Sequence, residues 1–476
     1  MRKNIIKDRK VKDLIYTLSS NIITLLVGVV ITFLIPKELS IGEYGYLKIF
    51  TFYVGYIGFF HFGFNDGIYV NYGNYEYEDL PKKTFRGYFR FLLAFQGLVS
   101  ILIIALAIAF SGDKIRTIIY ISLGVNALIL NITGYFEFIS QIIRKFKFYS
   151  ITLVLNKVMY IIGTIFLILS NYNGAIHFII LQTIINLIIL VIYLSKYKEL
   201  VFGDSKGIIE LKDDVKNNMS MGFFIMLGNF VSIIIIGVDR IFIDKFFTLE
   251  DFAMYSFAVS LLSMVYVILN GVRSVAYPYL SRINEGDLKR TYEIMKTVIF
   301  IILGYCLMAY FIFSVIVTNF IPQYSAALGV TSIIFPTVLF SGEINIVTTN
   351  FYKTLKLKKE YTINTIVAVV ISLITIITAF IMFGTKEAIA ASSLISFCLW
   401  GFYGDRFFSK YIGVNTIKHN IGEILTVILF LFLAFKFKWY IAIVLYFVGF
   451  TSISIVLFKN EIVNSINSLK KKNSTE

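Results

Sequence analysis

Residues 33–50 read FLIPKELSIGEYGYLKIF, and residues 241–258 read IFIDKFFTLEDFAMYSFA. The two stretches align without a gap, which places Lys37 opposite Lys245. In each copy one hydrophobic run ends, a short polar turn follows, and a second hydrophobic run begins. The repeated pattern predicts that the chain is built from two related halves, each starting with the same pair of helices.

The composition predicts that these helices lie in a membrane. Of the 476 residues, 58% are hydrophobic and 15% are charged, a balance that a soluble domain with a polar surface does not sustain. Apolar runs of about 18 to 23 residues, long enough to cross about 30 Å of hydrocarbon, recur along the chain. We therefore predict an all-α polytopic membrane protein. Hydropathy predicts about 14 spans, at 14–36, 46–65, 88–110, 115–136, 149–170, 174–194, 218–238, 252–271, 293–318, 329–350, 361–383, 387–404, 420–435 and 439–458.

Loop charge predicts the orientation. The basic N-terminal tail precedes a first span with no cleavage site for a signal peptide, so we expect this span to be retained. With the N-terminus inside, roughly 34 of the 44 Lys and Arg residues fall on the cytoplasmic side. Both termini are therefore predicted to be cytoplasmic. The net charge of +15 reflects this topology and indicates no nucleic-acid partner.

A second motif repeats further along each half. KFKFYSI at 145–151 is echoed by KLKKEYTI at 356–363, and the charge pattern puts both copies on the cytoplasmic side. A six-helix repeat that starts on the same side each time predicts parallel halves related by an axis along the membrane normal.

Polar interruptions suggest the domain organisation. We expect an N-terminal lobe at 1–195 with helices one to six, and a cytoplasmic linker with an interfacial helix at 196–217. A C-terminal lobe with helices seven to twelve follows at 218–412. Residues 413–476 add two extra helices and a cytoplasmic tail.

Three short motifs resemble one family. GEYG (42–45), GVDRIFIDKFFTLEDFAMYSFA (237–258) and YPYLSR (277–282) are similar to segments of the polysaccharide flippases of the multidrug, oligosaccharidyl-lipid and polysaccharide exporter superfamily. The resemblance implies a MATE-like fold with two six-helix lobes around a central cavity. It also implies flipping of undecaprenyl-pyrophosphate-linked oligosaccharides from the inner to the outer leaflet of a bacterial cytoplasmic membrane, by ion-coupled alternating access.

The resemblance also suggests partners. A flippase of this kind supplies the biosynthesis of a surface polysaccharide such as O-antigen or capsule, together with a polysaccharide polymerase and chain-length machinery. The sequence does not identify the sugars or the polymer. We expect no enzymatic activity and no catalytic residue, because phosphate-cradling loops, paired outer carboxylates and nucleophile triads are absent from the sequence.

Lys157 is the basic residue that topology does not explain. It lies about 10 residues beyond Lys147, hence about 15 Å along helix five, where a charge costs about 2.5 to 3.5 kcal/mol on insertion scales. Tyr160 and Thr164 follow on the same helix face. We predict that the three side chains bind the pyrophosphate and sugars of the substrate. The alternative is a lysine that snorkels or pairs with a neighbouring helix for structure alone.

Glu343 is predicted to be the counter-charge to Lys157 and the ion-coupling residue. It precedes Lys353 by about 10 residues, which again indicates a depth of about 15 Å. A coupling proton or sodium ion is the only bound species expected there, and no cofactor is predicted. The alternative is a carboxyl kept neutral by burial. The three histidines are scattered along the chain, so no metal site is expected.

Equivalent polar residues recur in helices one and seven. The repeat pairs Asn21 with Asn229 and Thr24 with Ser232. In helix seven, Gly222 lies on the same face as Asn229 and Ser232. We predict that Asn21 and Asn229 face the substrate. Close helix packing explains such small and polar faces equally well.

Charged residues near helix ends complete the predicted site. Arg90 and Arg273 lie near the cytoplasmic ends of helices three and eight, where they would meet an entering phosphate. The positive-inside rule is the alternative explanation. Asp239 and Arg240 end helix seven on the outer side, as an outer gate or a local salt bridge.

Rival functions remain open. A lipid II flippase or a multidrug exporter of the same superfamily shares the fold, although helix one lacks the acidic residue that the cation-coupled exporters usually carry. A membrane polysaccharide polymerase or glycosyltransferase is the rival from another class. Such enzymes usually need a large outer loop, and every predicted outer loop is short.

Overall fold

The computed structural model describes residues 2–73, 75–280 and 285–473. Side chains at both ends of the chain, and in parts of the segments 228–236 and 267–279, lie outside this description. Within the described residues the secondary structure is helical, with no strand. The predicted all-α fold class is confirmed.

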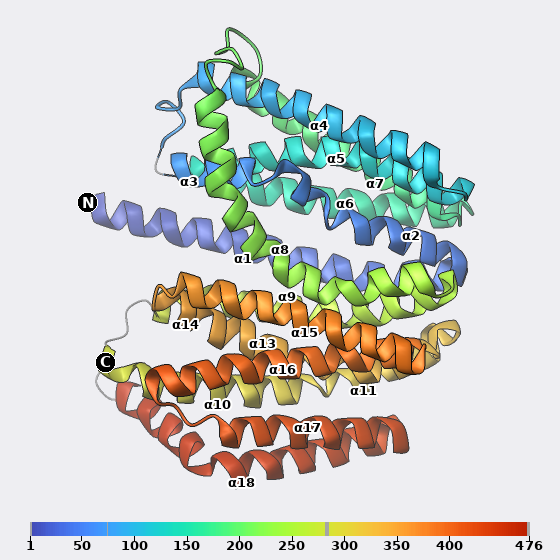
Figure 1. Ribbon diagram of the computed structural model, residues 1–476, viewed down its shortest axis with the longest axis vertical. Helices are drawn as coiled ribbons and strands as arrows, with labels where there is room; N and C mark the ends of the chain where they lie inside the picture. Colours follow the sequence, from blue (N-terminus) through green and yellow to red (C-terminus); the bar gives the residue numbers. More distant parts are fainter. Residues whose placement is uncertain (1, 74, 281–284, 474–476) are drawn as a thin grey trace. The chain divides into compact units, whose positions relative to one another are not determined.

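The chain divides into two compact units, Met1–Ile233 and Ile234–Glu476. Figure 1 shows their elements, coloured along the sequence. The first unit contains α1 (Arg2–Glu38), α2 (Ile41–Val54), η1 (Ile57–His61), α3 (Phe64–Tyr72), α4 (Lys82–Phe110), α5 (Lys114–Ile142), α6 (Phe146–Leu169), α7 (Ala175–Lys196), η2 (Lys198–Leu200) and the first part of α8 (Lys212–Phe246). The second unit continues with α9 (Leu249–Leu280), η3 (Glu285–Asp287), α10 (Leu288–Cys306), α11 (Ala309–Phe320), η4 (Pro322–Tyr324), α12 (Ala327–Ile334), α13 (Thr337–Glu343), η5 (Ile344–Thr348), α14 (Thr349–Thr354), α15 (Lys358–Phe383), α16 (Lys386–Ile412), α17 (Ile417–Lys436) and α18 (Trp439–Asn473).

The boundary between the units lies inside α8, beyond the linker predicted at 196–217. The linker packs onto the first unit because arginines of α4 hold its backbone. Arg86 donates hydrogen bonds to the carbonyl oxygens of Glu199 (2.8 Å) and Asp204 (2.9 Å). The sequence predicts a separate linker at 196–217, but these contacts attach the segment to the first unit.

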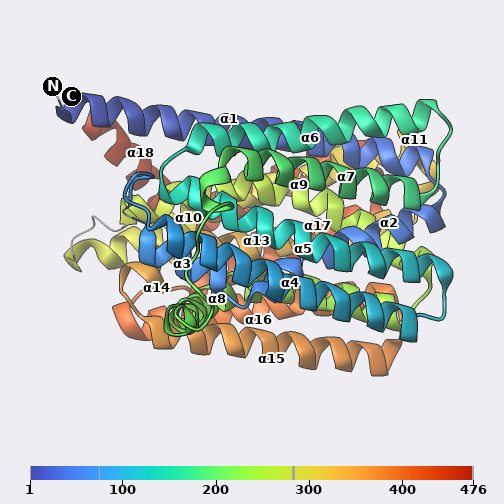
Figure 2. The same cartoon turned by 90° about the horizontal axis from the view of Figure 1, so that it is seen from above.

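The described residues contain ten helical segments that are long and apolar enough to cross a membrane, and the bent combination of α2, η1 and α3 makes an eleventh. The other predicted spans fall on α8, α9 and α16, which are 35, 32 and 27 residues long. Each therefore has the length of a span. Neighbouring helices run alongside each other in both views, as α4 does with α5 and α15 with α16 (Figure 1, Figure 2). The chain is a multispan helical membrane protein.

The predicted span at 46–65 is broken in the structure. The helices α2 and α3 enclose a bend of 58°, and Phe62 and Gly63 between them adopt φ angles of 48° and 77°. Such angles end a helix and are easily reached only by glycine. A Cβ atom on Gly63 would also overlap the backbone of Gly222 in α8. Close packing therefore explains the small residue Gly222.

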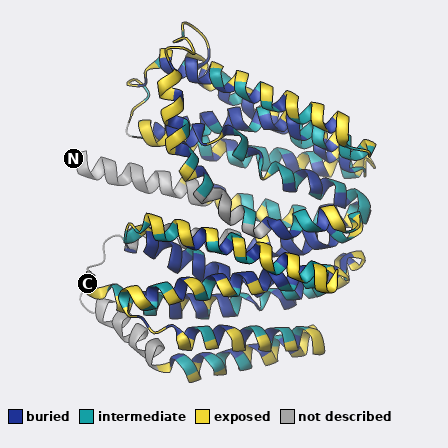
Figure 3. Cartoon of the chain, viewed as in Figure 1, coloured by how far each residue is buried: buried dark blue, intermediate teal, exposed yellow. Residues whose placement is uncertain are grey.

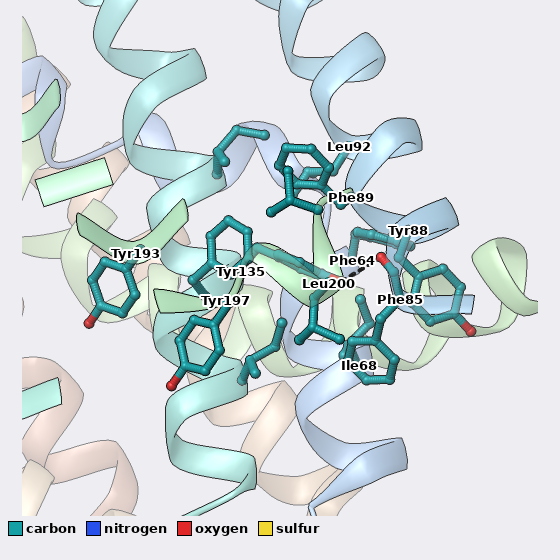
Figure 4. Packing of buried hydrophobic residues seen from close by; sticks show 14 of the residues in the cluster. Phe64, Ile68, Phe85, Tyr88, Phe89, Leu92, Tyr135, Tyr193, Tyr197 and Leu200 are labelled. Atoms are coloured by element: carbon teal, nitrogen blue, oxygen red, sulfur yellow. Dashed lines mark hydrogen bonds between the residues drawn. The ribbon is translucent and has the colours of Figure 1, made fainter. Parts of the chain in front are cut away.

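Aromatic side chains fill the core of the first unit (Figure 4). The hydroxyl of Tyr135 donates a hydrogen bond to the backbone oxygen of Phe85 at 2.8 Å, and the rings of Phe136 and Tyr197 stack with their centroids 5.9 Å apart. Lipid is as apolar as these side chains, so their transfer from lipid contributes little free energy. Close packing and the satisfied hydroxyls hold these helices together.

The turns that define the sequence repeat have the same local structure in both units. Ser40 accepts a hydrogen bond from the backbone nitrogen of Glu43 at the start of α2 (3.3 Å). Thr248 accepts one from the backbone nitrogen of Asp251 at the start of α9 (3.1 Å). Both are N-caps, which satisfy a free backbone donor in the first turn of a helix.

The acidic residues of these turns also make equivalent long-range contacts. A carboxylate oxygen of Glu43 accepts a hydrogen bond from the backbone nitrogen of Ala175 at the start of α7 (2.5 Å). Asp251 accepts one from Nζ of Lys386 at the start of α16 (2.5 Å). Each unit thus ties its first turn to the start of its sixth predicted helix.

The second repeated motif also folds alike in both units. Arg144 precedes α6, Lys356 precedes α15, and both residues have a φ angle of 56°. Positive φ is uncommon for residues other than glycine. Its recurrence shows that the short basic turns are structural equivalents.

The buried centre of the second unit is the segment Ala327–Thr354. Of its most apolar window 83% is buried, against 17% for Lys358–Phe383 in α15. Figure 3 shows the contrast between the exposed face of α15 and the buried residues of α13. A polar group on α12 to α14 is therefore shielded by protein on all sides.

The helices α17 and α18, which the sequence places outside the repeat, pack against α10. The hydroxyl of Tyr446 on α18 donates to the backbone oxygen of Gly304 at 2.8 Å. A Cβ on Gly304 would overlap the ring of Phe450. The hydroxyls of Tyr305 and Thr451 lie 2.9 Å apart. These contacts fix the extra helix pair to the second unit.

Candidate functional site

Four charged side chains meet inside the second unit. They are Lys296 on α10, Glu343 at the end of α13, Asp405 on α16 and Glu423 on α17. Nζ of Lys296 lies 2.5 Å from Oδ2 of Asp405, 3.0 Å from Oε2 of Glu343 and 3.5 Å from Oε1 of Glu423. Each side chain is at most 5% exposed. We call these four residues the charge cluster.

Glycines allow the three carboxylates to converge. Each acidic residue of the charge cluster directly follows a glycine, at positions 342, 404 and 422. A Cβ on Gly342 would lie 2.6 Å from Cδ1 of Leu303 in α10, and one on Gly404 would lie 2.9 Å from Cγ2 of Thr348. Only a residue without a side chain admits neighbours this close. The helices can therefore approach until the carboxylates reach one lysine.

The backbone changes its winding directly after Glu343. Residues Ile344–Thr348 form the π-helical turn η5, and all of α13 and most of η5 are buried. A π turn is rare and inserts an extra residue, which rotates the side chains on either side of it relative to one another. Such turns recur at functional sites.

Asp405 is the best satisfied carboxylate of the charge cluster. Besides its contact with Lys296, it accepts a hydrogen bond from the hydroxyl of Tyr292 at 3.1 Å. Asn420, with its amide nitrogen turned toward Asp405, donates to Oδ2 at 2.6 Å. An ammonium and two neutral donors satisfy this buried carboxylate. Asp405 and Lys296 form the closest ion pair of the charge cluster.

Glu343 and Glu423 lack such partners. Both oxygens of Glu343 and Oε1 of Glu423 are buried and make no hydrogen bond of good geometry within the described part of the chain. Their contact is with the ammonium of Lys296, which Asp405 already engages more closely. The charge cluster thus holds two carboxyl groups more than its single cation balances.

His419 lies next to the charge cluster on α17. Its Nε2 is 3.0 Å from the hydroxyl oxygen of Thr297, and its ring packs against Phe458 with centroids 4.7 Å apart. His419 is buried. Among the described residues, no group of three or more His, Cys, Asp or Glu side chains has the arrangement to hold a metal ion.

The structure gives Glu343 a counter-charge within its own unit, Lys296 at 3.0 Å. Lys157 belongs to the first unit, and its pairing with Glu343 stays a prediction. Lys157 is half-buried on α6, and within the described residues it makes no ion pair or hydrogen bond. Tyr160 and Thr164 are buried on the same helix, and the hydroxyl of Thr164 has no hydrogen-bond partner there. Substrate binding by these three residues stays a prediction.

Arg90 contacts the linker. It donates to the backbone oxygen of Gly203 (2.8 Å) and to the hydroxyl of Ser205 (2.7 Å). These contacts occupy both terminal nitrogens of its guanidinium, so a substrate phosphate would have to compete with them. Arg273 lies on α9, and its side chain is outside the described residues.

The remaining predicted residues are dispersed. Asn21 is exposed on α1, whereas the side chain of Asn229 on α8 lies outside the described residues. Asp239 is buried and accepts hydrogen bonds from the hydroxyls of Tyr255 (2.6 Å) and Ser393 (3.3 Å). One oxygen of Asp239 also accepts from the backbone nitrogen of Arg240 at 2.7 Å. Their role as an outer gate stays a prediction.

Sequence reasoning missed Lys296, Asp405 and Glu423. Lys296 and Glu423 lie inside the spans predicted at 293–318 and 420–435, and a charge within a span is a functional candidate by the same rule that selected Glu343. Lys296 lies close to the start of its predicted span, where cytoplasmic loop charge is the alternative explanation. The glycine before each acid is a further signal.

The chain thus has a multispan helical fold, two compact units and a buried charge cluster. The sequence matches the family described as polysaccharide biosynthesis proteins over residues 11–284, and the chain belongs to this family. No curated protein matches the sequence. The predicted family resemblance is confirmed.

Solved transporters have a similar fold. A lipid II flippase, MurJ, in an inward closed conformation, superposes with a TM-score of 0.68 at 15% sequence identity, covering 95% of this chain and 100% of that chain. A MATE transporter, ClbM, in complex with Rb⁺ reaches a TM-score of 0.43 at 13% identity, covering 82% of this chain and 93% of that chain. The likeness to the lipid II flippase, at 15% identity, shows the fold alone.

Proposed function

We propose that the protein is a flippase that moves undecaprenyl-pyrophosphate-linked oligosaccharide repeat units from the inner to the outer leaflet of a bacterial cytoplasmic membrane. The observation that carries the proposal is membership of the polysaccharide biosynthesis family by a chain with a transporter fold. The fold it shares with a lipid II flippase supports a lipid-linked cargo. Transport, not bond chemistry, is the proposed activity.

The substrate has a charged pyrophosphate and polar sugars that must be shielded from hydrocarbon. A half-buried ammonium with a buried tyrosine and threonine on the same helix suits this task, because it offers one cation and two hydroxyl groups. Lys157, Tyr160 and Thr164 on α6 have this arrangement. They are the proposed contacts for the substrate, and Glu343 is the proposed coupling residue.

The proposal includes a setting and partners. Both termini are cytoplasmic in it, and a polysaccharide polymerase with its chain-length machinery uses the flipped unit on the outer side. The polymer would be a surface polysaccharide such as O-antigen or capsule.

Reconstitution tests the proposal. Purified protein is placed in liposomes that contain undecaprenyl-pyrophosphate oligosaccharide with a fluorophore on the sugar, and a membrane-impermeant quencher is added outside. We expect the quenchable fraction to grow with time beyond that of protein-free liposomes. Lys157→Ala should abolish this growth, whereas Lys147→Ala, which removes a lysine from the cytoplasmic end of the same helix, should leave most of it. A quenchable fraction equal to that of protein-free liposomes would refute the proposal.

A lipid II flippase is the second candidate, because the fold similarity to such a protein covers 95% of this chain. The same assay separates the two when lipid II with a labelled sugar replaces the oligosaccharide lipid. Faster flipping of lipid II would favour the second candidate.

A further inference from the structure

The charge cluster is unbalanced as the structure places it. If all four groups were ionised, Lys296 would contribute one positive charge and the carboxylates three negative charges. A buried charge without a counter-charge costs about 3 to 5 kcal/mol in soluble proteins, and membrane interiors are no more tolerant. At least one carboxyl group therefore carries a proton in this conformation.

The geometry identifies which carboxyls hold the proton. Asp405 accepts contacts from Lys296, Tyr292 and Asn420, so its oxygens are satisfied. Glu343 and Glu423 have buried oxygens without a hydrogen bond and lie further from the ammonium. We infer that Glu343 and Glu423 form a proton-binding site that takes up and releases a proton during the transport cycle. The inference rests on the proposed transport function and adds to it the coupling ion and the second carboxyl.

A proton fits this site better than a sodium ion. The ammonium of Lys296 already occupies the position between the carboxylates, within 3.5 Å of each of them. A metal cation there would be repelled by Lys296 and would have to displace it. Sodium also needs several oxygen ligands around itself, and the ammonium already fills the position that the carboxylate oxygens surround.

Other titratable groups face the site from each helix packed around it. On α17 the nearest is His419, whose Nδ1 is buried without a hydrogen bond and could relay a proton. The neighbouring groups are Tyr292 on α10, Tyr266 on α9 through its contact with Ser341, Cys398 on α16 near Glu423, and Lys418 near His419. The tyrosines and the thiol carry no positive charge, so they do not balance the surplus negative charge.

Proton exchange at this site would act on helix packing. Glu343 belongs to α13, inside the six-helix repeat, and Glu423 belongs to α17, outside it. A proton on either carboxyl removes its attraction to Lys296, and loss of the proton restores it. The protonation state of the two glutamates therefore affects how α13 and α17 contact α10. Of these helices, α17 belongs to the pair α17 and α18, which lies outside the repeat.

Infrared difference spectroscopy of the purified full chain tests the inference without any substrate. The carbonyl stretch of a protonated carboxylic acid is recorded between acidic and alkaline buffers, in wild type and in Glu343→Gln and Glu423→Gln. We expect a carboxylic acid band that disappears at alkaline pH in wild type and is weaker in each variant, because each glutamine removes one of the two surplus carboxyl groups. Glu199→Gln is the matched control, because Glu199 is an exposed glutamate paired with Lys82, and this variant should keep the band.

Two results would overturn the inference. A band that persists unchanged in both glutamine variants would place the proton elsewhere. A band abolished by sodium at constant pH would identify a sodium site. Glutamine variants that unfold are recognised by their elution and melting profiles. In that case Glu423→Asp, which keeps a carboxyl group on a shorter side chain, should retain a carboxylic acid band at a shifted frequency. Failure of the flipping assay with the band intact would refute the proposed function and leave the proton site standing.

Discussion

Replacement of Lys296 by methionine should destabilise the protein strongly at neutral and alkaline pH. Methionine keeps an unbranched side chain of similar length and removes the only cation of the charge cluster. Asp405 would lose its ion-pair partner at 2.5 Å, and Glu343 and Glu423 would lose the ammonium that they share. Removing one member of a buried ion pair costs about 3 to 5 kcal/mol. We expect a loss of this size, measured as lower abundance in membranes and a lower melting temperature in detergent.

The loss should depend on pH with a defined sign. Without Lys296 the folded variant avoids uncompensated charge by binding an additional proton, which the unfolded chain does not bind near neutral pH. Stability falls with rising pH wherever the folded state binds more protons, by about 1.4 kcal/mol per pH unit for each additional proton. The melting temperature of Lys296→Met should therefore approach that of wild type in acidic buffer and fall away from it in alkaline buffer.

Two comparisons make the reasoning refutable. The double variant Lys296→Met with Asp405→Asn should recover most of the lost stability, because neutral residues replace the whole ion pair. Lys386→Met breaks a pair with Asp251 at the same distance of 2.5 Å, but its side chains are 23% and 25% exposed, so its loss should stay below about 1 kcal/mol. Equal losses for Lys296→Met and Lys386→Met, or no recovery in the double variant, would show that burial of the charge cluster is not what makes it sensitive.

Three further predictions follow from other parts of the chain. Lys157→Ala should abolish flipping in proteoliposomes at normal protein abundance, and Lys157→Arg should keep part of the flipping because the positive charge persists. Wild-type flipping by abundant Lys157→Ala protein would exclude Lys157 as the phosphate contact. Gly222→Val should lower the melting temperature by far more than Gly286→Val, because a side chain at Gly222 would overlap the backbone of α3 and nothing lies within 4 Å of a Cβ on Gly286; similar melting temperatures of the two variants would contradict the close crossing. Reporter fusions at residue 476 and in the turn at 384–387 should report opposite sides of the membrane, and a shared side would exclude the predicted topology.

The predicted span at 46–65 shows where hydropathy loses accuracy. The run is mostly apolar, so the sequence predicts one straight span. The bend at Phe62 and Gly63 arises because α3 must cross α8 at Gly222. That requirement comes from a helix more than 150 residues further along the chain, and hydropathy contains no information about it.

The sequence by itself determined the membrane class, the approximate positions of the helices and the repeat. Hydrophobic length and the positive-inside rule are local properties, and the aligned turns at Ser40 and Thr248 cap their helices through residues three positions away. Depth along a single helix also selected Glu343, whose side chain is buried in the structure. Such local properties can be deduced without knowing which helices are neighbours.

Only the tertiary structure decided which charges meet. Lys296, Glu343, Asp405 and Glu423 come from four helices spread over more than 120 residues, and no periodicity relates them. The energy of a buried charge depends on the distance to its counter-charge and on the shielding around both. Both quantities are set by helix packing, which brought Lys296 to Glu343 and left Lys157 in the other unit.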